Sequence, residues 1–369
     1  MQAAVRGRQG GATLMVDGQT ESGTATGHGK ASRRAPRDGR GRENTPTMRA
    51  IVQSGYGAVP EDVFWLEQIA RPAIGPGEVL VRVRAASVDA GTLHMMTGIP
   101  YLIRLTGPRG PRNPVPGMAV AGTVEAVGQN VTGLERGDEV FGTCGGSLAE
   151  YARARASRLA RKPVNLTFEQ AAAVPVSASA ALQAVRDHAH VQAGQHVLIT
   201  GASGGVGTFA VQIAKALGAE VTAVCSTPKT DLARAIGADH VIDYTREDYL
   251  GGERRYDAIV DIAGSRRVSH LRRALTPSGT LVITGGAGGP LLDGIDRNLR
   301  ASLLSPFVSQ KLTAFVARLR QSDLLALRDM IESGTVMPAV DRAYPLSEAV
   351  AAVRYLTDGL ARGKVVISL

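Results

Sequence analysis

The stretch His196-Val-Leu-Ile-Thr-Gly-Ala-Ser-Gly-Gly-Val-Gly207 decides the fold of this chain. It begins as a short apolar strand and ends in a glycine-rich turn. A helix is predicted to follow directly, because apolar residues recur at i, i+3, i+4, i+7, i+8 and i+11 from Val206 to Leu217. Gly218 ends that helix, and residues 220–225 form a second apolar strand. A strand, a helix and a second strand in this order make a βαβ unit, which indicates a parallel sheet.

The turn of this unit has the composition of a dinucleotide-binding site. Backbone N–H groups and the positive end of the helix dipole both point at such a turn, which favours a bound anion. Glycines let the backbone approach a pyrophosphate closely, and a hydroxyl offers a further hydrogen bond. Ala202 replaces the first glycine of the G-x-G-x-x-G fingerprint, and its small side chain still permits the turn. The predicted cofactor-binding residues of the turn are Ser203, Gly204, Gly205, Val206 and Gly207.

A competing motif overlaps the same residues. Gly201-Ala-Ser203-Gly-Gly205 has the form G-x-S-x-G, the turn that carries the nucleophilic serine of α/β-hydrolases. That interpretation needs an acid and then a late histidine, and no histidine follows His270. It also leaves the repeated strand–helix units after residue 207 without an explanation. The dinucleotide interpretation is therefore favoured.

The residues after the second strand indicate which dinucleotide is bound. NAD-binding proteins usually carry an acidic residue there, which holds the ribose 2′-hydroxyl. This chain has Ser226, 19 residues after Gly207, and then Lys229. A lysine supplies a cation for a 2′-phosphate, and the missing carboxylate removes a repulsion, so we predict NADP(H). The same Ser-Thr-Pro segment is also typical of a helix N-cap, and the two roles are compatible.

Composition narrows the class of protein. The chain has 369 residues, enough for two domains, and a formal net charge of +9. Its two cysteines, Cys144 and Cys225, are far apart and lack metal-ligand spacing, which indicates a reducing compartment, expected to be the cytoplasm. No apolar run reaches the length of a membrane-spanning helix, so no membrane is expected as a partner.

Residues 1–47 have a composition of their own. They contain eight basic and four acidic residues, many glycines and hardly any large apolar side chain, so we expect a disordered basic extension. The arginines and serines are also typical of a transit peptide, although the acids weaken that interpretation. Translation from Met48, just before the first predicted strand, is a further alternative. Some basic tails bind nucleic acid, but no aromatic residues interleave with these charges, so nucleic acid is not an expected partner.

The rest of the chain divides by pattern into two parts. Residues 48 to about 160 are rich in strands, among them 79–85, 117–128 and 138–142. From about residue 172 strands alternate with helices, which predicts a parallel sheet. Its expected strands are 196–200, 220–225, 240–242, 257–261 and 280–284. After about residue 338 a strand, a helix and a last strand over 364–369 follow, and this last strand is expected to complete the first domain.

Several stretches together resemble the medium-chain dehydrogenase/reductase superfamily, in its zinc-free quinone-oxidoreductase-like branch. They are Met48–Gln53, Pro116–Val124, Arg136–Gly142, Ala173–Ser177, Gly201–Gly207, Gly237–Tyr244 and Ala361–Val366. The resemblance implies an α/β fold with a GroES-like β-barrel catalytic domain over residues 48–172, completed by 337–369. It implies a Rossmann domain with a doubly wound parallel sheet over 173–336. It also implies NADPH-dependent reduction of quinones, activated alkenes or carbonyl compounds in a cleft between the two domains.

The resemblance extends to cofactor-binding residues. Ser226, Lys229 and Tyr244 stand where relatives surround the 2′-phosphate. Lys364 lies in the matching stretch near the carboxyl terminus and is counted with the residues that bind NADPH.

The sequence also bears on zinc. Zinc alcohol dehydrogenases of the superfamily carry His-Glu after the glycine that corresponds to Gly117, whereas this chain has Met118 and Ala119. Neither side chain is a zinc ligand, and four closely spaced cysteines for a structural zinc site are missing. No metal site is therefore expected.

Residues 87–98 occupy the family's active-site stretch, and they keep the family pattern only in part. Relatives usually carry Asn at Asp89 and Asp at Thr92, and some quinone reductases carry Tyr at His94. His94 is able to donate a proton or polarise a carbonyl, and a partly buried surface histidine is an equal alternative. Tyr101 is a second candidate donor or a wall of the cleft. The predicted catalytic residues are Asp89, Thr92, His94 and Tyr101, and the run 95–103 suits an apolar substrate.

We therefore expect a zinc-independent NADPH-dependent reductase. An enoyl-thioester reductase is the alternative within enzymes. A catalytically weak NADPH-binding sensor or nucleic-acid-binding protein is the alternative outside them. The resemblance implies a homodimer, for which the apolar segment 307–316 offers a sheet edge, with an internal strand as the other interpretation.

Overall fold

The computed structural model of the chain describes residues 46–284 and 308–369. The extension predicted over 1–47 therefore lies almost wholly outside the described residues. Thr45–Leu369 form one compact unit, so the boundary predicted between residues 172 and 173 stays a prediction. None of the helices within the described ranges has both the length and the apolar character needed to span a membrane.

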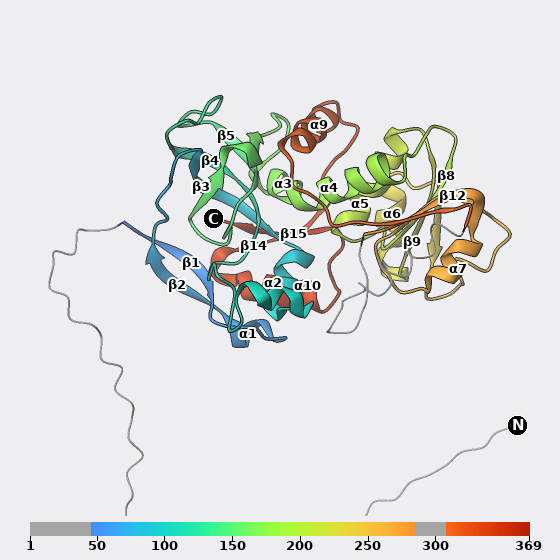
Figure 1. Cartoon of the computed structure of the whole chain (residues 1–369), viewed down its shortest axis with the longest axis horizontal. Helices are drawn as coiled ribbons and strands as arrows, with labels where there is room; N and C mark the ends of the chain where they lie inside the picture. The colour runs from blue at the N-terminus through green and yellow to red at the C-terminus, as the bar shows by residue number, and fades with distance from the viewer. Residues whose placement is uncertain (1–45, 285–307) are drawn as a thin grey trace, which may run out of the picture. The chain divides into compact units, whose positions relative to one another are not determined.

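The first part of this unit is a largely antiparallel sheet of seven strands (Figure 1). Its strand order is β14-β15-β3-β4-β5-β7, and β6 also pairs with β3. The strands are β3 (Glu78–Val88), β4 (Ala119–Val127), β5 (Glu139–Thr143), β6 (Tyr151–Arg155), β7 (Leu159–Arg161), β14 (Val340–Pro345) and β15 (Lys364–Ser368). β1 (Thr47–Gln53) and β2 (Phe64–Ala70) form a separate antiparallel pair. The last strand of the chain thus joins the first part of the fold, as the sequence predicts.

The second part is a parallel sheet of six strands, which confirms the predicted doubly wound α/β class. Its order is β10-β9-β8-β11-β12-β13, and every pairing in it is parallel. The strands are β8 (His196–Thr200), β9 (Glu220–Cys225), β10 (His240–Asp243), β11 (Tyr256–Asp261), β12 (Leu275–Ile283) and β13 (Lys311–Ala314). The chain passes from β8 to β9 on one side and later to β11 on the other. Ligands bind at such a reversal of strand order, outside the carboxyl ends of the strands.

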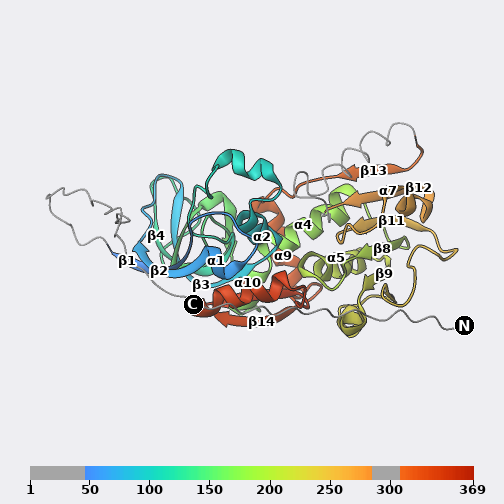
Figure 2. The ribbon, with the colours of Figure 1, turned by 90° about the horizontal axis from the view of Figure 1, so that it is seen from below.

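Helices cover this sheet and connect it to the first part. The predicted helix after the glycine-rich turn is α5 (Gly205–Ala216), which packs against α4 (Pro175–Leu182). The other helices are α1 (Pro60–Val63), α2 (Ala90–Thr97), α3 (Phe168–Ala173), α6 (Thr230–Ala235), α7 (Val268–Arg273), α9 (Gln321–Glu332) and α10 (Ala349–Thr357). Shorter turns are the 3-10 helices η1 (Tyr101–Thr106), η2 (Ala156–Arg158), η4 (Thr227–Lys229) and η6 (Leu346–Glu348) and the π-helix η3 (Gln183–His188). Figure 2 shows α10 beside β14, and β13 beyond β12 at one side of the parallel sheet.

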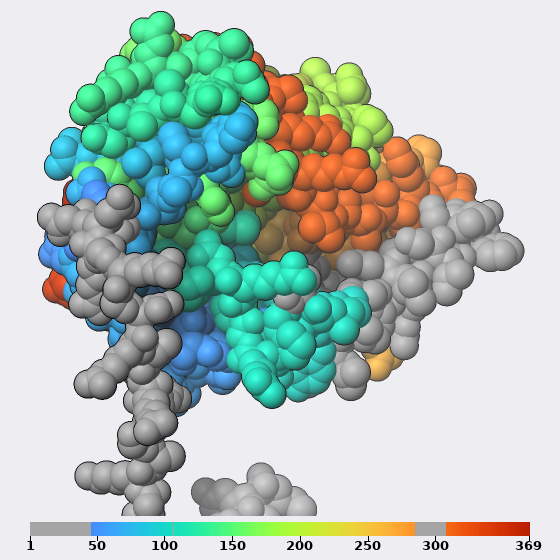
Figure 3. Space-filling view, turned by 60° about the vertical axis from the view of Figure 1, so that its left-hand side comes forward, coloured from blue at the N-terminus to red at the C-terminus, as the bar shows by residue number. Residues whose placement is uncertain are grey.

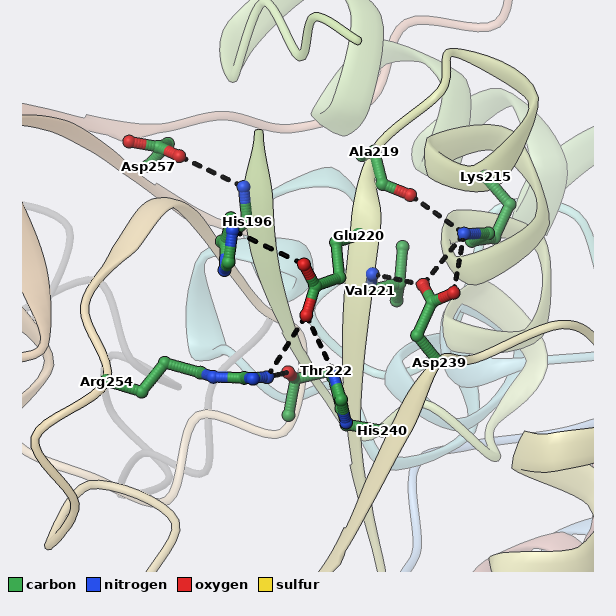
Figure 4. Close-up of polar contacts among 10 residues, drawn as sticks. All are labelled: His196, Lys215, Ala219, Glu220, Val221, Thr222, Asp239, His240, Arg254 and Asp257. Atoms are coloured by element: carbon green, nitrogen blue, oxygen red, sulfur yellow. Dashed lines mark hydrogen bonds and ion pairs between the residues drawn. The ribbon is translucent and has the colours of Figure 1, made fainter. Parts of the chain in front are cut away.

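Polar residues tie together the amino-terminal edge of the parallel sheet (Figure 4). The Glu220 carboxylate lies 3.3 Å from His196, 2.6 Å from His240 and 3.4 Å from Arg254. The hydrogen bond from His240 is the main reason why the pKa of Glu220 is lowered. His196, Glu220 and His240 are the first residues of β8, β9 and β10, and Arg254 lies just before β11. The network therefore stabilises the edge where the strands begin, opposite the carboxyl edge where a ligand is expected.

A buried ion pair joins α9 to the π-helix and carries a stability prediction. Asp323 is 2% exposed and accepts hydrogen bonds from Gln183 at 2.7 Å and from Arg186 at 2.8 Å. We expect Asp323→Ala to lower the free energy of unfolding by about 1–3 kcal/mol, because Gln183 keeps only the Arg318 carbonyl oxygen as an acceptor and Arg186 keeps only Asp187. Denaturant unfolding measures this loss. Asp329→Ala on the same helix is the control, since that carboxylate is 71% exposed, and a loss equal to that of Asp323→Ala would contradict the argument.

Candidate functional site

A cavity of about 580 Å³ opens at the carboxyl ends of the parallel strands, where the reversal of strand order predicts a ligand. The glycine-rich turn, the end of β9 and the loop after β11 form its walls. The lining residues are Thr200, Gly201, Ser203, Gly204, Val224, Cys225, Ser226, Lys229, Tyr244, Tyr249, Ala263, Ser265 and Arg266. They include two cations and no carboxylate.

The glycine-rich turn has the geometry of an anion site. Gly201 has a φ of +67°, a left-handed conformation that glycine adopts without strain. A Cβ on Gly207 would lie 2.1 Å from the Gly201 carbonyl oxygen, so the start of α5 approaches the turn more closely than any side chain permits. The N-cap of α5 is Gly204, and no side chain caps the helix. The first N–H groups of a helix of 12 residues are therefore available to a phosphate at this end.

The residues predicted around a 2′-phosphate meet at the cavity. Ser226, Lys229 and Tyr244 all line it. Ser226 occupies the N-cap position of η4 and is followed by a proline in the first turn, as the N-cap interpretation expects, but its hydroxyl makes no capping hydrogen bond. The Lys229 ammonium donates to the carbonyl oxygens of Gly359 at 2.8 Å and Ala361 at 2.7 Å. Burial lowers the pKa of Lys229, and Asp341 partly opposes that shift.

Several lining residues were not predicted from the sequence. Thr200 ends β8, and its hydroxyl donates to the buried carboxylate of Asp261 at 2.7 Å. The same hydroxyl accepts the N–H groups of Ile262 and Ala263 at 3.1 and 3.2 Å, which fixes the loop that carries Arg266. The signal that finds these positions is their place directly after parallel strands. Tyr249 lies within the irregular segment between β10 and β11, and no pattern in the sequence indicates it.

Other predicted cofactor residues lie outside the lining of this cavity. Gly205, Val206 and Gly207 form the first turn of α5 behind it. Lys364 is 2% exposed, and its ammonium points to the Val88 carbonyl oxygen at 3.4 Å and the Ser177 hydroxyl at 3.1 Å. Burial lowers the pKa of Lys364, and the Asp89 carboxylate opposes that shift.

Asp89 and Thr92, both predicted as catalytic, form a capping box at the start of α2. The Thr92 N–H donates to Asp89 Oδ1 at 3.2 Å, and the Asp89 N–H donates to the Thr92 hydroxyl at 3.4 Å. Thr92 is 1% exposed and Asp89 8% exposed. The structure therefore gives both residues a role in starting the helix, and a direct role in catalysis stays a prediction.

His94 and Tyr101 lie near each other in sequence but differ in surroundings. His94 is half-buried on α2, and its Nδ1 lies 2.9 Å from the Ile99 carbonyl oxygen. Tyr101 begins η1 and is 42% exposed, and the Arg104 guanidinium lies 4.7 Å from the centre of its ring. Leu102 and Leu105 on the same turn are 55% and 77% exposed. In Figure 3 the teal part of the chain that contains η1 stands out from the surface.

Within residues 46–284 and 308–369, no three His, Cys, Asp or Glu side chains are grouped so that they could hold a metal ion.

Comparisons with known proteins agree with this architecture. Residues 236–367 match the family described as zinc-binding dehydrogenase, and residues 75–164 match the alcohol dehydrogenase GroES-like domain. The chain is 32% identical to the 2-methylene-furan-3-one reductase of Solanum lycopersicum, over 87% of this chain and 79% of that protein. It is 33% identical, with the same coverage, to the chloroplastic NADPH-dependent alkenal/one oxidoreductase of Arabidopsis thaliana. The solved structure of the quinone oxidoreductase from Coxiella burnetii has a TM-score of 0.78 at 26% identity, over 88% of this chain and 100% of that one.

Proposed function

Because the chain belongs to the medium-chain dehydrogenase/reductase superfamily, in its quinone-oxidoreductase-like branch, we propose that it is a zinc-independent reductase that uses NADPH to reduce a quinone, an activated alkene or a carbonyl compound. The observation that carries the proposal is the cavity beside the glycine-rich turn. Ser226, Lys229 and Tyr244 line it together with Arg266, and no carboxylate is among its lining residues. A site of this charge favours the dinucleotide with the additional phosphate.

The residues present fit NADPH. The first N–H groups of α5 and the Ser203 hydroxyl would hold the pyrophosphate, since the uncapped turn of Gly204 leaves them without a side-chain acceptor. Ser226 and Lys229 would hold the 2′-phosphate. When bound, the nicotinamide supplies the hydride.

The residues proposed to contact the substrate lie on α2 and η1. Since a carbonyl oxygen only accepts hydrogen bonds, Ile99 holds the proton of His94 on Nδ1 and thereby fixes the orientation of the ring. We propose that His94, with both ring nitrogens protonated, donates from Nε2 to polarise or protonate the substrate oxygen, and that the exposed leucines of η1 contact an apolar acceptor. The names of the tomato and Arabidopsis relatives, a furanone reductase and an alkenal/one oxidoreductase, support an activated alkene as acceptor.

Turnover by the purified protein tests the proposal. NADPH and NADH oxidation would be measured against quinones, enones and aldehydes, before and after treatment with a zinc chelator. We expect turnover of at least one acceptor that prefers NADPH and is unchanged by the chelator, because Met118 and Ala119 cannot bind zinc. Turnover that appears only with added zinc would refute zinc independence. Tight NADPH binding without turnover on the whole panel would instead favour an NADPH-binding sensor.

The assembly and location of the protein are part of the same proposal. Within the described residues, β13 is the edge strand of the parallel sheet. This agrees with the prediction that segment 307–316 offers a sheet edge, except that Phe307 lies outside the described residues. We propose a homodimer in which two such edges pair. The free cysteines Cys144 and Cys225 support a reducing compartment, and we propose the cytoplasm.

A further inference from the structure

A buried lysine lies between the glycine-rich turn and the active-site helix. Lys364 is the first residue of β15, and β15 is an interior strand between β14 and β3. Its side chain passes directly behind the turn, because a Cβ on Gly205 would lie 3.0 Å from Lys364 Cδ. The main chain is tied to the same turn, since the Gly363 N–H donates to the Ser203 carbonyl oxygen at 2.9 Å.

The charged end of this lysine reaches the start of α2. Its ammonium lies 3.4 Å from the Val88 carbonyl oxygen and 3.9 Å from Asp89 Oδ2. Asp89 Oδ1 caps α2, whereas Oδ2 is buried and has no hydrogen-bond partner in the structure. Burying an ammonium and a carboxylate is costly unless they compensate each other, so the two groups depend on each other.

We propose that Lys364 is a positioning residue that couples occupation of the glycine-rich turn to the placement of α2. The alkyl chain of Lys364 packs against the turn, and its ammonium donates to Ser177 and lies within ion-pair distance of Asp89, the cap of the helix that carries His94. A ligand that fixes the turn thereby also fixes Lys364 and, through Asp89, the start of α2. This inference rests on the proposed function for its ligand, NADPH, but it assigns Lys364 a task other than binding the cofactor.

Hydrogen exchange tests the coupling without relying on turnover. In the wild-type protein we expect saturating NADPH to slow amide exchange both in the turn, 201–207, and in α2, 90–97. In Lys364→Met the turn should remain protected by NADPH while the protection of α2 is lost. We further expect kcat to fall by about ten- to a hundredfold, because the helix is misplaced, while the Kd for NADPH changes by less than about threefold.

Two other variants make the test specific. Asp89→Asn retains a residue that caps helices but removes the charge, so it should reproduce the loss of α2 protection. The double variant should be no worse than either single one, since both remove one interaction. Lys162→Met is the matched control. The Lys162 side chain is also largely buried, with 7% exposed, but its ammonium donates to the carbonyl oxygens of Pro163 and Leu166 and pairs with Glu139, none of which belongs to the turn or to α2. It should lower stability and leave the NADPH protection of α2 intact.

The possible results separate this inference from the proposed function. A Kd for NADPH raised by more than about tenfold in Lys364→Met, with an unchanged kcat at saturation, would overturn it and make Lys364 a cofactor ligand. NADPH binding to the wild-type protein without protection of α2 would overturn the coupling alone. A wild-type protein that binds no NADPH would overturn both. If Lys364→Met does not fold, Asp89→Asn decides, and intact α2 protection in that variant would overturn the inference.

Discussion

Gly207→Ala is expected to disrupt both the fold around the glycine-rich turn and the binding of NADPH. A Cβ at residue 207 would lie 2.1 Å from the Gly201 carbonyl oxygen and 2.6 Å from Ala202 Cα. Both are backbone atoms, so relief requires α5 to move away from β8. We expect the free energy of unfolding to fall by at least about 2–3 kcal/mol. NADPH affinity should fall by at least about tenfold, because the N–H groups of the displaced helix no longer converge on the phosphates.

Gly204→Ala is the matched control for this change. Gly204 has an ordinary φ of −87°, and a Cβ there would meet only the Gly201 carbonyl oxygen, at 3.4 Å. We expect the free energy of unfolding to fall by no more than about 1 kcal/mol, because alanine is a poorer N-cap than glycine but meets no close backbone atom here. Because Gly204 lines the cavity, its methyl group should still weaken NADPH binding. Thermal unfolding and NADPH titration of both variants separate the two effects. A Gly207→Ala protein with wild-type stability would show that the turn differs from the one described.

The glycine-rich turn and its helix could be predicted because their signals are local. The spacing of apolar residues from Val206 to Leu217 specifies α5, and the glycines specify the turn before it. The strand order that places Ser226 and Tyr244 beside the turn follows from the βαβ pattern and the family resemblance. Local patterns therefore predict the half of the cavity formed by consecutive elements.

The remaining part of the site depends on long-range packing. A lysine at the start of a terminal strand is normally expected at the surface, but Lys364 is buried because its side chain packs against the glycine-rich turn and reaches Ser177 of α4. The capping box of Asp89 and Thr92 is a local feature that the sequence analysis missed, since it assigned both residues to catalysis. The Asp-x-x-Thr spacing before an apolar segment is the signal that indicates it.

Lys229→Ala is expected to remove much of the preference for NADPH over NADH. Its ammonium lines the cavity, and a hydrogen bond to a charged phosphate is worth about 1–3 kcal/mol, so the Kd for NADPH should rise roughly 5- to 150-fold. The Kd for NADH should stay nearly constant, because NADH lacks the 2′-phosphate. Fluorescence titration with both dinucleotides measures the difference. Lys215→Ala is the control, since that lysine pairs with Asp239 and does not line the cavity.

Lys229 also has contacts within the protein, and these give a second explanation for any loss of affinity in the titration. Its ammonium also donates to the carbonyl oxygens of Gly359 and Ala361, just before β15. If this contact dominated, the variant would weaken the binding of NADPH and NADH equally, and the assignment of Lys229 to the 2′-phosphate would be wrong.

A pH series provides an independent check on the charge of Lys229. Because burial lowers the pKa of Lys229, the wild-type preference for NADPH should decline with rising pH before an ordinary lysine loses its proton. The same series with Lys229→Ala should show no such decline.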